Sequence, residues 1–162
     1  MNKDNFISVV KENQNLIFKI CNSYCSNYED RKDLQQDIII QLWNSFSKFD
    51  GRVKISTWIY RIALNTAISF YRKDRKRKEK TVGIDASVIS LPDSGPGFEQ
   101  DERISLLYKY LERLNEMDKA LILLVLEDKS YRDMAEILGI TETNVATKIS
   151  RIKKRIKEEF KH

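Results

Sequence analysis

Cationic side chains are concentrated in two short stretches of the chain, and phosphate binding is the chemistry that this arrangement allows. Residues 72–80 and residues 148–161 each carry seven lysines and arginines. Between these stretches, residues 81–102 carry five acidic side chains and no basic one. The net charge of the whole chain is only +5. The distribution of charge, more than its sum, therefore predicts a nucleic-acid partner and salt-sensitive binding.

The second basic stretch lies on a segment with a clear helical pattern. Apolar side chains repeat at helical spacing at Val145, Ile149, Ile152, Ile156 and Phe160. Just before it, a short apolar helix is predicted over residues 131–138, with Gly139 as its stop and Thr141 as the N-cap of the next helix. A short helix, a glycine turn and a basic helix together indicate a helix-turn-helix, whose second helix enters the DNA major groove.

The first turns of that final helix carry small and polar side chains that can reach base edges, while lysines and arginines further along can meet phosphates. The residues predicted to contact duplex DNA are Thr141, Thr143, Asn144, Thr147, Lys148, Arg151, Lys154 and Arg155. Phosphate contacts are also expected from Lys153 and Lys157. The alternative is an ordinary surface helix, but the register of Ala135, Gly139 and Val145 with the apolar stripe favours DNA binding.

Aromatic rings lie upstream of the first basic stretch, at Trp58, Tyr60, Phe70 and Tyr71. Rings next to cations suit single-stranded nucleic acid, because unpaired bases stack on the rings while phosphates meet the charges. Rings at helical spacing can equally form a hydrophobic core, and a charge run can be merely solvated. Both alternatives stay open for residues 58–80.

The elements that must position these residues are all predicted to be helices. Only five Gly and two Pro occur in 162 residues, which favours long helices over a turn-rich β fold. Apolar residues recur every four positions at Leu34, Ile38, Leu42 and Phe46. This segment follows a polar break at residues 27–31 and has Asp30 or Asp33 as its candidate cap. A glycine turn at residues 49–52 then precedes a long helix from about residue 57 to 77.

The fold class is therefore all-α, with two small helical domains at residues 1–80 and 101–162. The second domain is built around residues 117–126, whose dense apolar content predicts a buried central helix, and it ends in the helix-turn-helix. Most of the turn-forming residues lie between Thr81 and Gly97. This stretch is too long for an ordinary connection within a domain, so a flexible acidic linker is predicted at residues 81–100. A solvated tether with no further role is the alternative.

Several classes of protein and site are disfavoured. No run of about 18 apolar residues occurs, and the N-terminus lacks the apolar core of a signal peptide, so we expect a cytoplasmic protein that does not insert into a membrane. Cys21 and Cys25 are read as small apolar residues on one helix face, because His162 is the only histidine that could complete a zinc site. No metal or cofactor is expected. The chain has no phosphate-binding glycine loop or nucleophile motif, so it is not expected to be an enzyme.

Three segments, in the right order and spacing, resemble the extracytoplasmic-function sigma factors of bacterial RNA polymerase. Residues 33–43 (DLQQDIIIQLW) resemble the helix that binds core polymerase, and residues 56–65 (STWIYRIALN) the promoter-melting helix. Residues 130–141 (SYRDMAEILGIT) resemble the scaffold helix and turn of the C-terminal domain. Ile39 stands where the family often has Phe, and residues 144–149 differ from the most common recognition-helix sequence.

The resemblance implies a sigma factor that binds core RNA polymerase and directs promoter-specific initiation. Residues implied to dock on or support docking to the clamp helices of the largest subunit are Asp33, Leu34, Gln36, Asp37, Gln41 and Trp43. Residues implied to capture or approach −10 DNA are Asp50, Gly51, Arg52, Lys54, Trp58, Arg61, Asn65, Tyr71, Arg72 and Arg75. The final helix is implied to read the −35 element, and the acidic linker to pass near the RNA exit path.

The implied partners are promoter DNA, core polymerase including its flap, and an anti-sigma factor, which in this family is often anchored in a membrane. The main alternative is a helix-turn-helix regulator that binds duplex DNA without polymerase. In that case residues 33–43 and the acidic tether have no evident purpose. A third possibility, an anti-sigma or adaptor module, does not account for the basic final helix.

Overall fold

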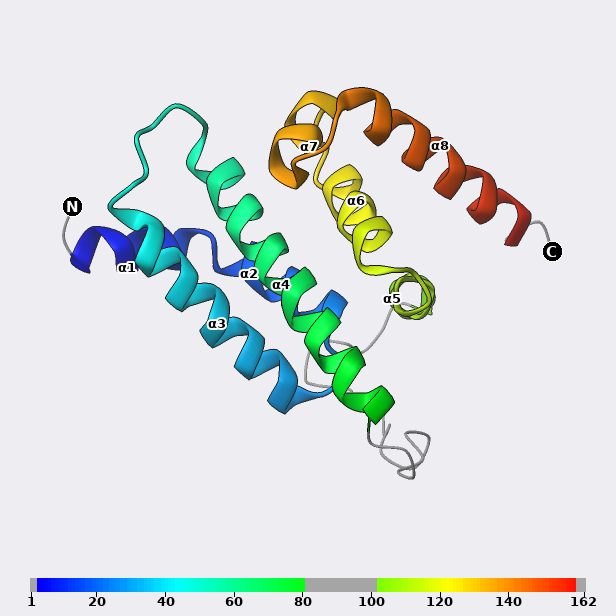
Figure 1. Cartoon of the computed structure of the whole chain (residues 1–162), viewed down its shortest axis with the longest axis horizontal. Helices are drawn as coiled ribbons and strands as arrows, with labels where there is room; N and C mark the ends of the chain where they lie inside the picture. Colours follow the sequence, from blue (N-terminus) through cyan, green and yellow to red (C-terminus); the bar gives the residue numbers. More distant parts are fainter. Residues whose placement is uncertain (1–2, 81–101, 160–162) are drawn as a thin grey trace. The chain divides into compact units, whose positions relative to one another are not determined.

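The computed structural model of the chain describes residues 3–80 and 102–159, and these residues form eight helices without a strand (Figure 1). The helices are α1 (Lys3–Glu12), α2 (Gln14–Tyr24), α3 (Tyr28–Phe46), α4 (Ile55–Lys80), α5 (Glu102–Glu112), α6 (Glu116–Leu126), α7 (Tyr131–Leu138) and α8 (Glu142–Glu159). The predicted all-α fold class is confirmed. The acidic linker predicted at residues 81–100 lies outside the described residues.

The chain divides into two compact units, Met1–Leu114 and Asn115–His162. Helix α5 contacts α2 and is grouped with the first unit. The sequence placed everything from residue 101 onward in the second domain, so the domain limits at residues 80 and 101 stay a prediction.

The core of the first unit is built where α2, α3 and α4 pack on one another. Helix α3 contributes the predicted stripe of Leu34, Ile38, Leu42 and Phe46, and all four side chains are buried. Their spacing of four residues keeps them on one face of the helix, so the opposite face of α3 is left for solvent or a partner. The predicted apolar stripe of α3 is therefore confirmed.

Helix α3 begins one turn earlier than the sequence predicted. The backbone N–H of Asp30 donates to the side-chain oxygen of Asn27 at 2.8 Å, which satisfies one of the free N–H groups at the helix start. The prediction of Asp30 or Asp33 as the cap was wrong. Asn27 provides the cap from within the polar break, and Glu29 and Asp30 occupy the first turn, where acidic side chains favour the positive end of the helix.

Helix α1 was not predicted. Its buried residue is Phe6, whose ring makes edge contacts with the rings of Trp43 and Phe46, at centroid distances of 5.0 and 5.3 Å. The helical spacing of Phe6, Val9 and Val10 was the available signal. Helix α1 thus supports one end of α3 from the side.

The helical spacing of Ile55, Ile59, Ile62, Thr66 and Ser69 marks one side of helix α4, with Trp58 and Ala63 near it, but the structure buries a wider face. Ile59 is fully buried, whereas Ser69 is exposed and the other three are only partly buried. The additional core residues of this helix are Trp58, Tyr60, Ala63, Leu64, Ala67 and Ile68. The difference arises because both α2 and α3 pack on α4, so a broad part of its circumference is covered.

The second unit places α8 against both α6 and α7. Helix α7 ends at Gly139, whose left-handed backbone (φ 70°) is the conformation that glycine adopts without steric cost. Helix α8 then starts with the backbone N–H of Asn144 donating to the Thr141 hydroxyl at 3.0 Å. The predicted C-terminal end of α7 at Gly139 and the predicted N-cap of α8 at Thr141 are both confirmed. Together they define the turn between the two helices.

The sequence predicted a buried, apolar central helix. Helix α6 is buried along most of its length, but its C-terminal end is exposed and some of its buried residues are charged. Leu121 and Leu124 are fully buried, but Val125 and Leu126 at its C-terminal end are exposed. At the other end, the charged residues Asp118 and Lys119 are buried. Burial in α6 therefore includes charged residues near its start and excludes the apolar residues at its end, so it does not follow the density of apolar residues.

Candidate nucleic-acid interface

Helix α8 presents a polar ridge because its apolar stripe faces inward, although Ile156 is only half-buried and Phe160 of the predicted stripe lies outside the described residues. Val145, Ile149 and Ile152 are buried between α8 and its neighbours. The exposed residues among those predicted to contact DNA are Thr141, Thr143, Asn144, Thr147, Arg151, Lys154 and Arg155, and Lys148 is half-buried. The side chain of Thr141 is used as the helix cap. The remaining residues form a polar and cationic surface suited to a DNA groove.

One flank of this ridge is closed by an ion pair to α6. The guanidinium of Arg155 lies 3.4 Å from the carboxylate of Asp118, whose side chain is only 7% exposed. Asp118 is itself placed by its backbone N–H, which donates to the Asn115 side chain at 2.8 Å. Arg155 was predicted to contact phosphate, and the structure turns its charge toward α6 while leaving its side chain 56% exposed.

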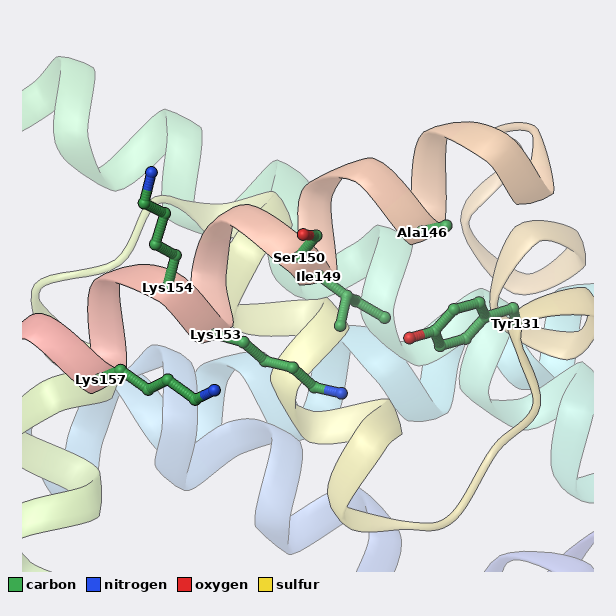
Figure 2. A pocket seen from close by; sticks show the side chains of 7 residues that line it. All are labelled: Tyr131, Ala146, Ile149, Ser150, Lys153, Lys154 and Lys157. Atoms are coloured by element: carbon green, nitrogen blue, oxygen red, sulfur yellow. The ribbon is translucent and has the colours of Figure 1, made fainter.

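The opposite flank of α8 is open. A hollow of about 420 Å³ lies there, between α8 and the start of α7. Figure 2 shows the Tyr131 hydroxyl directed toward Ile149, with the Lys153 and Lys157 side chains extending on the same side of α8. Lys154 points the other way, toward the exposed ridge. The two flanks of one basic helix are thus chemically different.

In the first unit, a short loop between α3 and α4 has a defined local structure. The Asp50 carboxylate accepts the backbone N–H of Arg52 at 3.1 Å and pairs with its guanidinium at 3.1 Å. Gly51 between them has a left-handed backbone (φ 79°), which strains any residue with a side chain. Asp50, Gly51, Arg52 and Lys54 are all exposed. The loop therefore presents polar and cationic groups to solvent in a preformed turn.

Aromatic rings pack on the core side of this loop. Trp58 is 8% exposed, and its ring contacts those of Phe46 and Phe49, at centroid distances of 6.1 and 5.2 Å. Tyr60 is also buried. Of the two open alternatives for these rings, the structure gives Trp58 and Tyr60 core positions. Trp58 thus joins the loop to the core and offers little of its ring to a nucleic-acid base.

The other residues predicted to approach −10 DNA lie along α4. Asn65, Arg72 and Arg75 are exposed, whereas Arg61 and Tyr71 are half-buried. The Tyr71 ring meets the Tyr24 ring of α2 edge-on, at a centroid distance of 6.3 Å. The exposed members place cations and one amide on the outer side of α4, beyond the preformed loop.

The outer face of α3 carries the residues predicted to dock on a polymerase. Asp33, Gln36, Asp37 and Gln41 are exposed, and Trp43 is 49% exposed. Leu34 is fully buried and so holds α3 in the core without reaching a partner. The sequence missed Ile40, which is 52% exposed on the same face. Ile40 lies three residues after Asp37 and three before Trp43, and this helical spacing could have placed it on the same face of α3.

Comparison with known protein families gives two matches that correspond to these regions. Residues 9–77 match the family model of sigma-70 region 2, and residues 104–156 match that of sigma-70 region 4. The RNA polymerase sigma factor YlaC of Bacillus subtilis is 30% identical over 137 residues, which cover 82% of this chain and 78% of YlaC. The chain belongs to the extracytoplasmic-function sigma factors of RNA polymerase.

Other sigma factors match over a larger share of the chain. The SigW factor of Bacillus subtilis is 22% identical, covering 98% of this chain and 90% of SigW. The sigma-E factor of Haemophilus influenzae is 27% identical, covering 98% of this chain and 88% of that factor. As a sigma factor, this chain is a transcription initiation factor and not an enzyme, and it directs RNA polymerase to promoters.

The fold also matches a solved structure. The sigma factor RpoE of Bartonella quintana, crystallised with the anti-sigma factor NepR, superposes with a TM-score of 0.77 at 21% identity, covering 97% of both chains. At this level of identity the likeness concerns the fold alone.

The cysteines of this sigma factor lie in its core. Burial raises the pKa of both thiols to about 12, most of all because the thiolate loses its hydration. Cys21 and Cys25 are free and buried, and they remain protonated at neutral pH. Among residues 3–80 and 102–159, no group of three or more His, Cys, Asp or Glu side chains converges as a metal site requires. Within the same ranges, no helix has the length and apolarity needed to cross a membrane.

Proposed function

We propose that this sigma factor uses three separate surfaces during initiation. The outer face of α3 docks on the clamp helices of the largest polymerase subunit. The loop at residues 50–54 captures an unpaired base of the −10 element, and α8 reads the −35 element in the major groove. In this proposal residues 1–80 and 101–162 act as two domains joined by residues 81–100. The chain acts in the cytoplasm, where polymerase and promoter DNA meet.

The observation that carries the proposal is the division of α3 into two opposite faces. Every fourth residue from Leu34 to Phe46 is buried, while most of the carboxylates and amides between them are exposed, namely Gln36, Asp37, Gln41 and Asn44. Trp43 and Ile40 are about half-exposed within that polar row. Their exposure is not explained by packing in the core, so it indicates a partner surface. A mixture of carboxylates with an aromatic and an aliphatic side chain suits a protein partner better than DNA, because phosphates repel Asp33 and Asp37.

The −10 role is supported by the exposed turn at Asp50–Arg52. Its carboxylate is held by the backbone and guanidinium of Arg52, so the turn is shaped before any DNA arrives. A preformed turn lowers the entropy cost of trapping an extruded base. Trapping the base offsets part of the unstacking energy, which is a few kcal/mol, so melting requires no catalytic residue.

The −35 role is supported by the confirmed helix-turn-helix geometry and by the exposed ridge of α8. Thr143, Asn144 and Thr147 lie in the first two turns, where a recognition helix approaches base edges. Arg151 follows one turn later and is long enough to reach a guanine. The exposed cations beyond it can then meet phosphates.

An anti-sigma factor is the expected regulator. Two solved relatives by fold are complexes of this kind, namely RpoE with NepR and CnrH with the cytosolic domain of CnrY. We extend this relationship to the present chain, with a membrane-anchored protein as the expected partner. The flap of core polymerase is the further contact expected for the second domain.

Promoter-specific initiation in vitro tests the proposal. Core polymerase with the purified full chain, given a pool of genomic DNA, is expected to start transcription at a defined set of promoters that core polymerase alone ignores. Charge reversal by Asp37→Lys is expected to weaken binding to core polymerase at least tenfold, because it adds repulsion at the docking face. The matched control is Glu12→Lys at the exposed end of α1. Tight autonomous binding to one operator, with no affinity for core polymerase, would instead identify a duplex-binding regulator.

A further inference from the structure

Phe6 is the buried residue of helix α1, and its ring contacts two rings of α3 that have different environments. One belongs to Phe46, a core residue that is 7% exposed, at a centroid distance of 5.3 Å. The other belongs to Trp43, which is 49% exposed on the outer face of α3, at 5.0 Å. Trp43 and Phe46 are three residues apart, so they are neighbours along the helix. Phe6 therefore links a surface ring to the core.

This contact restricts the movement of the Trp43 indole. Among residues 3–80 and 102–159, no other aromatic ring contacts Trp43. The two ring planes meet edge-on at 66°, which is a favourable geometry for an aromatic pair. Phe6 is itself held by Phe46, whose ring contacts that of Trp58 at 6.1 Å. An exposed indole without such a neighbour samples several rotamers, so Phe6 lowers the side-chain entropy of Trp43 before any partner binds.

We propose that Phe6 is a positioning residue for polymerase binding, and that it acts by holding the Trp43 indole in the orientation that docks. The inference rests on the docking role proposed for the outer face of α3 and adds a second helix to that surface. Trp43 then serves as an aromatic anchor within a row of polar side chains, an arrangement typical of the energetic centre of a protein interface. An anchor that is ordered in advance loses less entropy when it binds.

The position of Phe6 in the chain separates this contact from the part that matches the family. The match to sigma-70 region 2 begins at residue 9, so Phe6 lies before it. The structure describes every residue of α1, and apart from Phe6 they are exposed or half-buried. A helix that only extended the core would bury a stripe of apolar side chains. In α1 the full burial is instead confined to the one ring that meets Trp43.

Replacement of this ring by an aliphatic side chain tests the inference in the full chain. Phe6→Leu keeps an apolar side chain but removes the edge contact. Acrylamide quenching of fluorescence reports mainly on Trp43, because the chain has two tryptophans and Trp58 is only 8% exposed. We expect a larger quenching constant and a lower fluorescence anisotropy in the variant. Its affinity for core polymerase should fall about two- to tenfold, the effect of ordering one large side chain on binding.

A double-mutant cycle separates positioning from a general effect on the fold. Phe6→Leu is expected to cause no further loss of affinity in a Trp43→Ala background, because the side chain that it positions is then absent. The matched control is Val10→Ala, which removes apolar bulk from a half-buried residue one turn further along α1. It should change neither the quenching constant nor the affinity. Circular dichroism verifies folding, and Phe6→Met takes the place of Phe6→Leu should that variant not fold, since methionine fills irregular space.

The outcomes distinguish this inference from the docking role on which it rests. An equal loss of affinity with and without the Trp43 indole would assign Phe6 to stability or to direct contact with polymerase, and would overturn the inference. Weaker binding with unchanged quenching of Trp43 would do the same. Full affinity of Phe6→Leu, beside weak binding of Trp43→Ala and Asp37→Lys, would overturn the inference alone. Full affinity of those last two variants would contradict the docking role of α3, and the inference with it.

Discussion

Helices α4 and α8 both end in basic stretches of similar composition, but the two helices are packed into their units in different ways. Helix α4 packs against both α2 and α3, so a broad face is covered and its upstream rings Trp58 and Tyr60 belong to the core. Helix α8 buries a narrow stripe against α6 and α7, and most of its circumference stays exposed. The number and placement of neighbouring helices, and not the local charge, decide whether an aromatic or cationic residue can meet a ligand.

Removing a ring from each unit is the strongest test of this comparison. Trp58→Ala is expected to lower the free energy of unfolding by about 3–5 kcal/mol, because it leaves a cavity against Phe46 and Phe49. Tyr131→Ala, at a half-exposed ring, should change it by less than about 0.5 kcal/mol. Urea denaturation followed by circular dichroism measures both. Unchanged stability of the Trp58 variant with loss of promoter melting would place that ring at the DNA.

A change on the exposed ridge of α8 comes next in size. Arg151→Ala is expected to weaken binding of holoenzyme to the −35 duplex by about 1–3 kcal/mol, if its guanidinium reads a base edge. Fluorescence anisotropy with the correct and a scrambled −35 sequence separates the two roles open to this side chain. Equal losses on both duplexes would make Arg151 a phosphate contact and leave base reading to Asn144 and the threonines.

Removal of the Arg155–Asp118 ion pair tests how far this contact makes the two flanks of α8 differ. Asp118→Asn removes the charge that holds Arg155, and we expect it to lower the free energy of unfolding by about 0.5–1 kcal/mol, since Arg155 is half-exposed. The freed guanidinium should make DNA binding more sensitive to salt than in the wild-type protein. Titration of promoter affinity against salt checks this. A slope equal to that of the wild type would mean that Arg155 meets phosphate even while paired.

The last difference between the two units is absent at neutral pH and develops only at alkaline pH. The pKa of both thiols is raised from 9.0 to about 12 by burial in the first unit. The unfolded chain therefore loses thiol protons at a lower pH than the folded chain. Stability from this source is complete below pH 9 and is lost as pH rises from 9 toward 12.

Comparison of the wild type with Cys21→Ala/Cys25→Ala isolates this effect from titration of lysines and tyrosines. We expect the difference in unfolding free energy between the two proteins to shrink as the pH is raised through this range. A difference that is constant with pH would show that the thiols are not shielded in the folded state.

Much of the candidate site was predictable because it depends on local rules. The stop at Gly139, the cap at Thr141 and the inward stripe of α8 follow from backbone sterics and helical periodicity alone. The burial of Leu34, Ile38 and Leu42 follows from their spacing in the same way. What could not be predicted involves two elements at once. Phe6 behind Trp43 and Asp118 beside Arg155 each join residues far apart in the chain.

By itself the sequence determined the all-helical class, the helix-turn-helix and the polar row on α3, since each depends on the order of residues within a segment. The tertiary structure alone decided that Trp58 supports a loop, that Arg155 turns toward α6 and that Lys153 and Lys157 share an open hollow with Tyr131. The physical reason is that periodicity defines the faces of a helix, whereas the elements packed against it determine which of those faces remain accessible.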